Sequence, residues 1–217
     1  MSFMKKYKKR DKLQSLGEEI ANSVSHGVAA LFGIPGLVLL LIKSNNISEY
    51  VGSAIFGASM IILYTMSCLY HAFPNGSTVK AVFKRFDHVS IYLLIGGTFA
   101  PIFLIVLPSP LKWVMLAAQW IVIIVGIVLK SVRVHKFQKL HLAMFLALGW
   151  SGLFFMVDLY VFAPQSFWLI LGGGISYTIG VIFYALRPFK YSHFIWHLFV
   201  MGGTVLQFFA VYSYLLT

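Results

Sequence analysis

Seven runs of apolar residues follow one another along the chain, and each is long enough to cross a bilayer as a helix. A helix needs about 20 apolar residues to span a hydrocarbon core of about 30 Å. The runs cover residues 23–42, 51–73, 86–107, 113–129, 140–160, 167–186 and 194–216. They are continuous, whereas the strands of a membrane barrel alternate with a period of two. The sequence therefore predicts an all-α integral membrane protein, a bundle of seven transmembrane helices.

The composition agrees with this prediction and excludes a soluble enzyme. Hydrophobic residues make up 59% of the chain and charged residues 11%, whereas soluble domains are about half apolar and about a quarter charged. We expect a basic tail over residues 1–22, with an interfacial helix within residues 5–20, and a transmembrane domain over residues 23–217. The single cysteine, Cys68, excludes an intramolecular disulfide and a four-cysteine metal site.

The distribution of basic residues predicts the orientation. Fifteen of the 17 Lys and Arg residues lie in the tail or near the loops after the second, fourth and sixth runs, and only Lys43 and Lys112 lie on the other side. Basic residues favour the cytoplasmic side. We therefore expect a multi-pass protein of the cell membrane with a cytoplasmic amino terminus and an outside carboxyl terminus. Topology and attraction to anionic headgroups explain the net charge of +11 better than nucleic acid does.

Polar and ionisable side chains gather at a few ends of these runs. They are Glu19, Asn22 and His26 at the first run, Ser67 and His71 at the second, Asp87 and His88 at the third, and His193 and His197 at the seventh. With the predicted orientation, all these ends lie on the cytoplasmic side. Polar groups inside a membrane are costly and commonly functional.

The spacing favours convergence of these side chains. His193 and His197 are four residues apart, as are Ser67 and His71, so each pair shares a helix face. Three imidazoles near a carboxylate meet the needs of a catalytic zinc site, which keeps a fourth position for water. The alternative is that the histidines only form hydrogen bonds between helices. We expect His135 and His141, at the loop after the fourth run, to lie among lipid headgroups.

Residues 96–98 and 202–204 both read Gly-Gly-Thr, in the third and seventh runs. Thr98 lies eleven residues after Asp87, and Thr204 lies eleven residues after His193, so each threonine is nearly on the face of the earlier polar residue. At about 1.5 Å per residue, both are about 16 Å deeper in the membrane. Two interpretations stay open: a cavity running inward from the histidines, or ordinary hydrogen bonding between closely packed helices.

The polar motifs resemble those of the hemolysin III family, from about Glu18 to the end of the chain. They are Glu19-x-x-Asn22-x-x-x-His26, Ser67-x-x-x-His71, Asp87 and His193-x-x-x-His197. This family is the bacterial-type branch of a superfamily that includes progestin and adipoQ receptors and alkaline ceramidases. The resemblance implies a zinc ion near the cytoplasmic face, bound by His71, His193 and His197, with Asp87 near the water on the metal and Ser67 alongside.

The superfamily includes activity on the amide bond of ceramide-like lipids. We therefore expect a zinc-dependent hydrolase of a lipid amide or ester, whose substrate enters laterally from the membrane. In this role Asp87 orients water or accepts its proton, and Ser67 donates to the developing oxyanion. Glu19, Asn22 and His26 are expected to support the metal ligands from a second layer.

Two other functions remain open at this stage. A cytolytic, pore-forming protein needs a polar lining across the bilayer, and the fourth run contributes only Gln119. A receptor or sensor with a structural zinc needs a site closed by four protein ligands.

Overall fold

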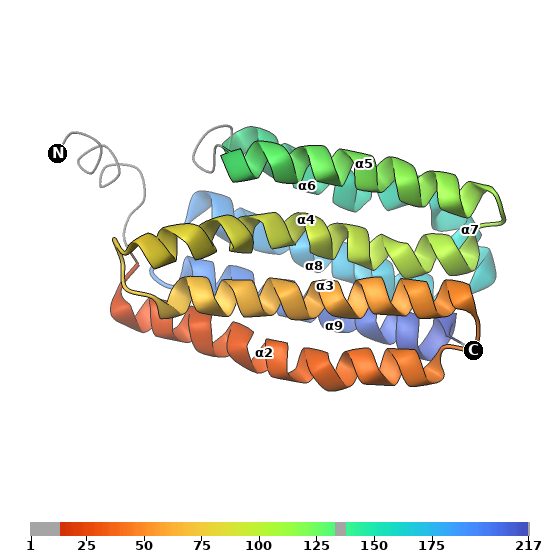
Figure 1. Cartoon of the computed structure of the whole chain (residues 1–217), viewed down its shortest axis with the longest axis horizontal. Coiled ribbons are helices and arrows are strands. Elements are labelled where there is room, and N and C mark those ends of the chain that lie inside the picture. Colours follow the sequence, from red (N-terminus) through yellow and green to blue (C-terminus); the bar gives the residue numbers. More distant parts are fainter. Residues whose placement is uncertain (1–13, 133–137, 217) are drawn as a thin grey trace.

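The computed structural model describes residues 14–132 and 138–216, which fold almost entirely into helices (Figure 1). The elements are α2 (Leu16–Lys43), α3 (Ile47–Ala72), α4 (Thr78–Val106), α5 (Leu111–Val132), α6 (Gln138–Trp150), η1 (Ser151–Phe155), α7 (Met156–Phe162), α8 (Pro164–Leu186), α9 (Ser192–Ala210) and η2 (Val211–Leu215). Most of the predicted interfacial helix, and His135, lie outside the described residues.

Seven spans of the described chain are long and apolar enough to cross a membrane, and they coincide with the seven predicted runs. The first and third helices begin earlier than hydropathy alone predicts. Ser15 and Glu18 form a capping box at the start of α2, and the Ser77 side chain caps α4 by accepting from the Lys80 amide. Caps of this kind satisfy amides that have no partner within the helix. The polar residues Glu19 and Lys80 are therefore held on regular helices.

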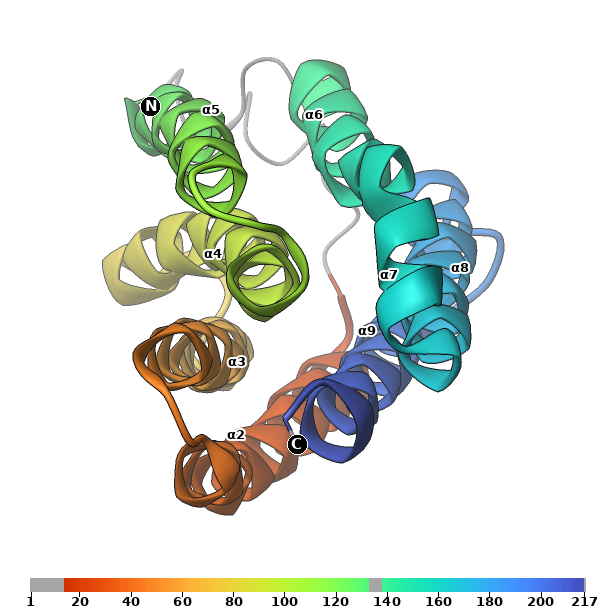
Figure 2. The ribbon, with the colours of Figure 1, turned by 90° about the vertical axis from the view of Figure 1, so that its right-hand side faces the viewer.

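The helices form a ring that closes on itself (Figure 2). Helices α2, α3, α4 and α5 pack in chain order, α8 packs along α9, and α9 returns against α2. The first and seventh spans thus become neighbours. As a result, the start of α9 lies at the same end of the bundle as the start of α2 and the end of α3. We call this the histidine end.

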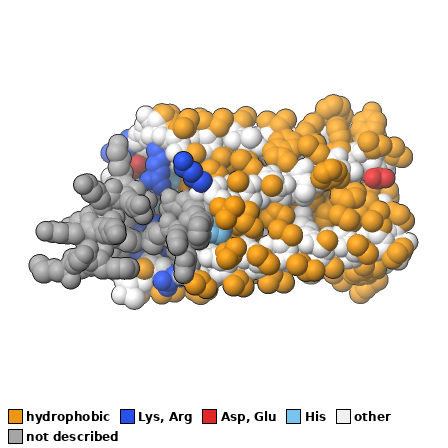
Figure 3. All heavy atoms as spheres, turned by 90° about the horizontal axis from the view of Figure 1, so that it is seen from above, with side chains coloured by type: hydrophobic (Ala, Val, Ile, Leu, Met, Phe, Trp, Pro, Cys, Tyr) orange, Lys and Arg blue, Asp and Glu red, His pale blue; other side chains and the backbone are white. Residues whose placement is uncertain are grey.

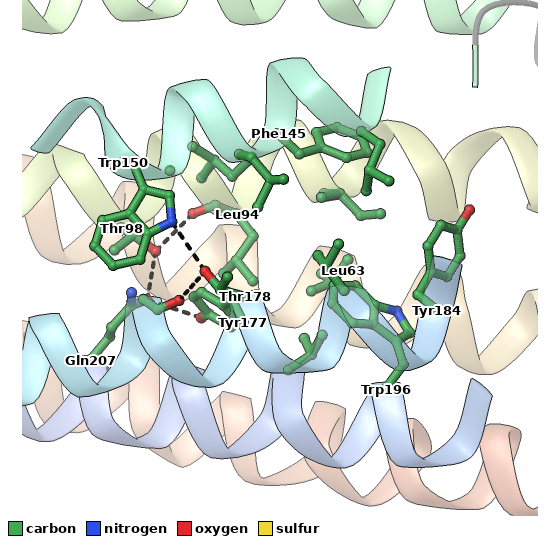
Figure 4. A pocket seen from close by; sticks show the side chains of 18 of the residues that line it. Leu63, Leu94, Thr98, Phe145, Trp150, Tyr177, Thr178, Tyr184, Trp196 and Gln207 are labelled. Carbon is green, nitrogen blue, oxygen red and sulfur yellow. Dashed lines mark hydrogen bonds between the residues drawn. The ribbon is translucent and has the colours of Figure 1, made fainter. Parts of the chain in front are cut away.

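The fifth span is broken, although its apolar run predicted one continuous helix. It consists of α6, a short 3₁₀ segment (η1) and α7. Gly149 lies just before η1 and Gly152 lies within it, and glycine is a poor helix former. A side chain at Gly152 would collide with the ring of Phe99, so its absence lets η1 pack closely on α4. The break turns Trp150 toward the middle of the bundle (Figure 4).

The sides of the bundle are apolar, while Lys and Arg side chains gather at the histidine end (Figure 3). Large apolar residues such as Phe32 and Phe154 are 73% and 84% exposed, as suits contact with lipid. The half of the bundle away from the histidine end is filled instead by buried Leu40, Phe56 and Phe103. This apolar packing closes the bundle at that end.

The close approach of α3 and α4 gives a stability prediction. A side chain at Gly97 would overlap Ser59, whereas one at Gly149 meets nothing within 4 Å. We expect Gly97→Ala to lower the free energy of unfolding by about 1–3 kcal/mol, because overpacking forces neighbours apart. Gly149→Ala is the control and leaves stability unchanged or raises it. Thermal unfolding of both variants in detergent tests this, and equal midpoints would contradict the packing described.

Candidate metal centre

Four histidines from three helices meet at the histidine end. They are His26 on α2, His71 in the last turn of α3, and His193 and His197 in the first turns of α9. The rings of His26 and His197 are stacked with their centroids 3.7 Å apart, and the ring of His71 lies 5.0 Å from that of His197. His26, His71 and His197 are buried. The predicted convergence of these side chains is therefore present in the fold.

His71, His193 and His197 have the geometry of a metal-binding triad. One nitrogen from each lies within 4.8 Å of the others. The Nε2 atoms of His193 and His197 are 3.1 Å apart. Two nitrogens bound tetrahedrally to one ion at 2.0–2.1 Å would be about 3.3 Å apart. The His193–His197 pair therefore fits two sites of a tetrahedral divalent metal, and His71 lies close enough to supply a third ligand.

Glu19 orients the His71 ring. Its Oε2 atom lies 2.7 Å from His71 Nδ1 and 2.9 Å from Lys80 Nζ. A carboxylate on Nδ1 fixes the proton there and leaves Nε2 as the ligand atom. In agreement, His71 Nε2 is buried and has no hydrogen-bond partner among the described residues. Lys80 also donates to the Phe73 carbonyl at 3.0 Å, so the carboxylate is held by a fixed cation.

Asp87 lies on α4, and Ser67 lies on α3, one turn before His71. Asp87 Oδ2 is 3.4 Å from His88 Nδ1, and the same ring nitrogen lies 2.7 Å from the Lys84 carbonyl oxygen. Ser67 lies beside Asp87, and its hydroxyl is buried. Both line the same cavity as His193 and His197.

The remaining two residues of the first motif have different surroundings. Asn22 donates through its side-chain amide to Gln14 Oε1 at 2.7 Å, so its observed partner is not a histidine. His26 lies flat on His197, and neither of its ring nitrogens has a hydrogen-bond partner among residues 14–132 and 138–216. Glu19 thus contacts a histidine of the triad through a hydrogen bond, and His26 contacts another by ring stacking.

A cavity of about 140 Å³ extends from His193 and His197 into the bundle. Its wall near the histidine end carries His26, Ser67, Asp87, His193 and His197. Most of the rest is apolar, with side chains from α3, α4, α6, α8 and α9. The inward cavity that was one interpretation of the two threonines is present, and Thr98 is in its wall.

Comparison with known proteins places the chain in a family. Residues 14–208 match the family described as Haemolysin-III related. The chain is 39% identical over 207 residues to Hemolysin-3 of Bacillus cereus, covering 94% of each protein. It is 37% identical over 204 residues to the Hemolysin-3 homolog of Bacillus subtilis (strain 168), covering 92% of this chain and 95% of that one. The chain belongs to the hemolysin III family.

A more distant relative extends the similarity beyond bacteria. The human protein named monocyte to macrophage differentiation factor is 25% identical over 205 residues, which are 91% of this chain and 84% of that protein. This similarity supports the wider superfamily. The present chain is thus a multi-span membrane protein of the hemolysin III family.

One histidine of this hemolysin III protein is not where the sequence predicted it. His141 is 1% exposed, and its Nδ1 lies 2.8 Å from the hydroxyl of Tyr92, so it is not a headgroup-level residue. Lys130, buried at the end of α5, lies within electrostatic range of both His141 and Asp87. No sequence spacing links these residues, because they come from α4, α5 and α6. Lys80 was missed for the same reason.

The Glu19 contact predicts an effect on metal affinity. We expect Glu19→Gln to weaken metal binding by about 10–100-fold, because the His71 ring loses its charged partner. Glu49→Gln is a matched control, since Glu49 is also a buried carboxylate but accepts from the Asn45 amide, at the opposite end of α3. Competition with a chromophoric chelator measures both affinities. Equal affinities in the two variants would mean that Glu19 does not support the metal site.

Proposed function

We propose that this hemolysin III protein is a zinc-dependent hydrolase that cleaves an amide or ester bond of a membrane lipid. One observation carries the proposal: two histidines of the triad, His193 and His197, line a largely apolar cavity whose wall also holds Asp87. A cavity of this kind suits a lipid chain, and the triad with a carboxylate suits hydrolysis of a bond at its head. The reacting end of the substrate would lie at the histidine end.

His71, His193 and His197 would hold the zinc ion. Three imidazole ligands with a free fourth position are found in catalytic zinc sites, whereas structural sites are closed by four protein ligands. Among the described residues the metal-binding group contains three members, and this favours a catalytic over a structural metal. When bound, Zn²⁺ polarises a carbonyl oxygen and makes water more acidic.

The side chains around the triad would have the other roles in the reaction. Asp87, which lines the same cavity, would orient water and accept its proton. The Ser67 hydroxyl, which is buried beside Asp87, would donate to a developing oxyanion. Glu19 and Lys80 would keep His71 aligned, as their contacts of 2.7 and 2.9 Å support.

The shape of the bundle favours a lipid substrate over a transmembrane pore. A pore needs a polar path from one end to the other. Here the half away from the histidine end is filled by apolar residues such as Phe56 and Phe103. A chain that enters laterally from the membrane can reach the cavity without crossing that packed half. Cytolysis by release of lipid products remains compatible with this proposal.

Metal content and turnover together test the proposed function. We expect about one zinc ion per purified chain, measured by elemental mass spectrometry, and loss of both zinc and turnover of fluorescent lipid amides and esters in His193→Ala/His197→Ala. Asp87→Asn should keep zinc and lose turnover by about 10²–10⁴-fold, the usual worth of a general base. Asp158→Asn, an exposed carboxylate on α7, is the control. Full turnover in the double variant would refute the proposal.

We also propose that the histidine end faces the cytoplasm, because Lys and Arg gather there. A cysteine-labelling experiment in a Cys68→Ala background tests this. Asn45 and Asn75 are exposed in loops at opposite ends of α3. We expect a membrane-impermeant maleimide to label Asn45→Cys in intact cells and Asn75→Cys only after permeabilisation. The reverse pattern would invert the topology.

A further inference from the structure

A second group of polar side chains lines the cavity, away from the histidines (Figure 4). We call it the mid-span cluster, and it comes from α4, α6, α8 and α9. Its members are Thr98, Trp150, Tyr177, Thr178 and Gln207. The proposed hydrolysis uses none of them.

The mid-span cluster lies deep in the membrane. Gln207 follows His197 by ten residues on α9, and its neighbour Thr204 follows His197 by seven. At about 1.5 Å per residue, the cluster is about 10 to 15 Å from the triad. Between the two levels the wall is apolar, with Ile91, Leu94 and Val200 at intermediate helix positions. The cavity is therefore polar at two levels with an apolar stretch between them.

Hydrogen bonds within the cluster fix the Gln207 amide. Its Oε1 atom accepts from the Tyr177 hydroxyl at 2.9 Å and from the Thr98 hydroxyl at 3.0 Å. Tyr177 is also 2.9 Å from the Thr204 hydroxyl, which donates to the Val200 carbonyl. Gln207 is 5% exposed. Two hydroxyl groups thus lie against the amide oxygen, and the single proton of the Thr98 hydroxyl is shared between this oxygen and the Leu94 carbonyl oxygen at 2.9 Å.

This arrangement gives the amide nitrogen of Gln207 no hydrogen-bond acceptor among the described residues. Among the described residues Nε2 donates to no acceptor, while Oε1 takes both hydrogen bonds. The amide thus connects α9 to α4 and α8 through its oxygen, and its nitrogen stays available to a further acceptor. A plain hydrocarbon chain passing this point would leave the donor unpaired, which is unfavourable in a low-dielectric interior.

We propose that the cavity binds an amphiphile with two polar groups: a head at the histidine end, and a hydroxyl or carbonyl oxygen in mid-chain that accepts from Gln207 Nε2. This inference rests on the proposed function in one respect, since it takes the triad as the place where the polar head binds. The inference adds the class of substrate to the proposed function. The favoured lipid carries an oxygen about 10 to 15 Å from its reacting carbonyl, and a plain saturated acyl chain is disfavoured.

Three matched fatty acids test this inference on the zinc-loaded, full-length protein in nanodiscs. They are stearic acid, stearic acid with a hydroxyl group on its twelfth carbon, and stearic acid with a hydroxyl group on its second carbon. Displacement of a fluorescent fatty acid measures each affinity. We expect the first hydroxy acid to bind about tenfold more tightly than stearic acid, the usual effect of pairing one buried donor. The second hydroxy acid should show no such gain.

Two variants locate the effect. Gln207→Met removes the donor and should abolish the preference for the mid-chain hydroxyl. Gln119→Met is the matched control, because Gln119 is a buried glutamine of α5 whose side-chain atoms also have no hydrogen-bond partner among the described residues, and it is not part of the cavity wall. It should keep the preference.

The outcomes separate this inference from the proposed hydrolysis. Equal binding of the three acids, or binding of none, overturns it and means that only water or the chain itself occupies the cluster. A preference that survives in Gln207→Met also overturns it. Zinc content and turnover are measured on the same preparations. A preference without zinc or turnover would support the binding site and refute the hydrolase, whereas zinc and turnover without a preference would do the opposite.

Discussion

The carboxylate of Glu19 joins three helices at one level of the membrane. It lies on α2, accepts from His71 on α3, and pairs with Lys80 on α4. An isolated charge at this depth would be strongly unfavourable, and the pair of donors makes it tolerable. Because the carboxylate fixes the His71 ring, Nε2 of that ring faces the two histidines of α9. The candidate metal centre depends on this contact, since without it the triad has no fixed third member.

The two halves of the bundle divide the tasks of stability and binding. Away from the histidine end, large side chains such as Phe56, Phe103 and Leu215 are almost fully buried. Dense packing of this kind stabilises helices even in lipid, where no hydrophobic effect drives their association. The histidine half contains a cavity, and its polar residues line the wall of that cavity. Packing in that half therefore compensates for the cavity, which removes stabilising contacts from the histidine half.

The sequence was sufficient for the helices and the triad, but not for the contacts between distant helices. Apolar runs and basic loops located the seven spans, because both signals are local. Motif spacing predicted that the polar helix ends converge, and the family resemblance singled out His71, His193 and His197 among the histidines there. The Tyr92–His141 contact, the buried Lys130 and the break at η1 went unforeseen. Each depends on which helices are neighbours, and hydropathy carries no information about that.

The closed half of the bundle also restricts how a bound molecule can move through the protein. Since apolar side chains fill the end away from the histidines, a molecule in the cavity cannot pass through to the far side of the membrane. A lipid bound with its head at the triad would then enter and leave on the histidine side of these packed residues. Exchange with the bilayer is then confined to one leaflet. A protein built this way can alter the lipid composition of a single leaflet without moving any lipid across the membrane.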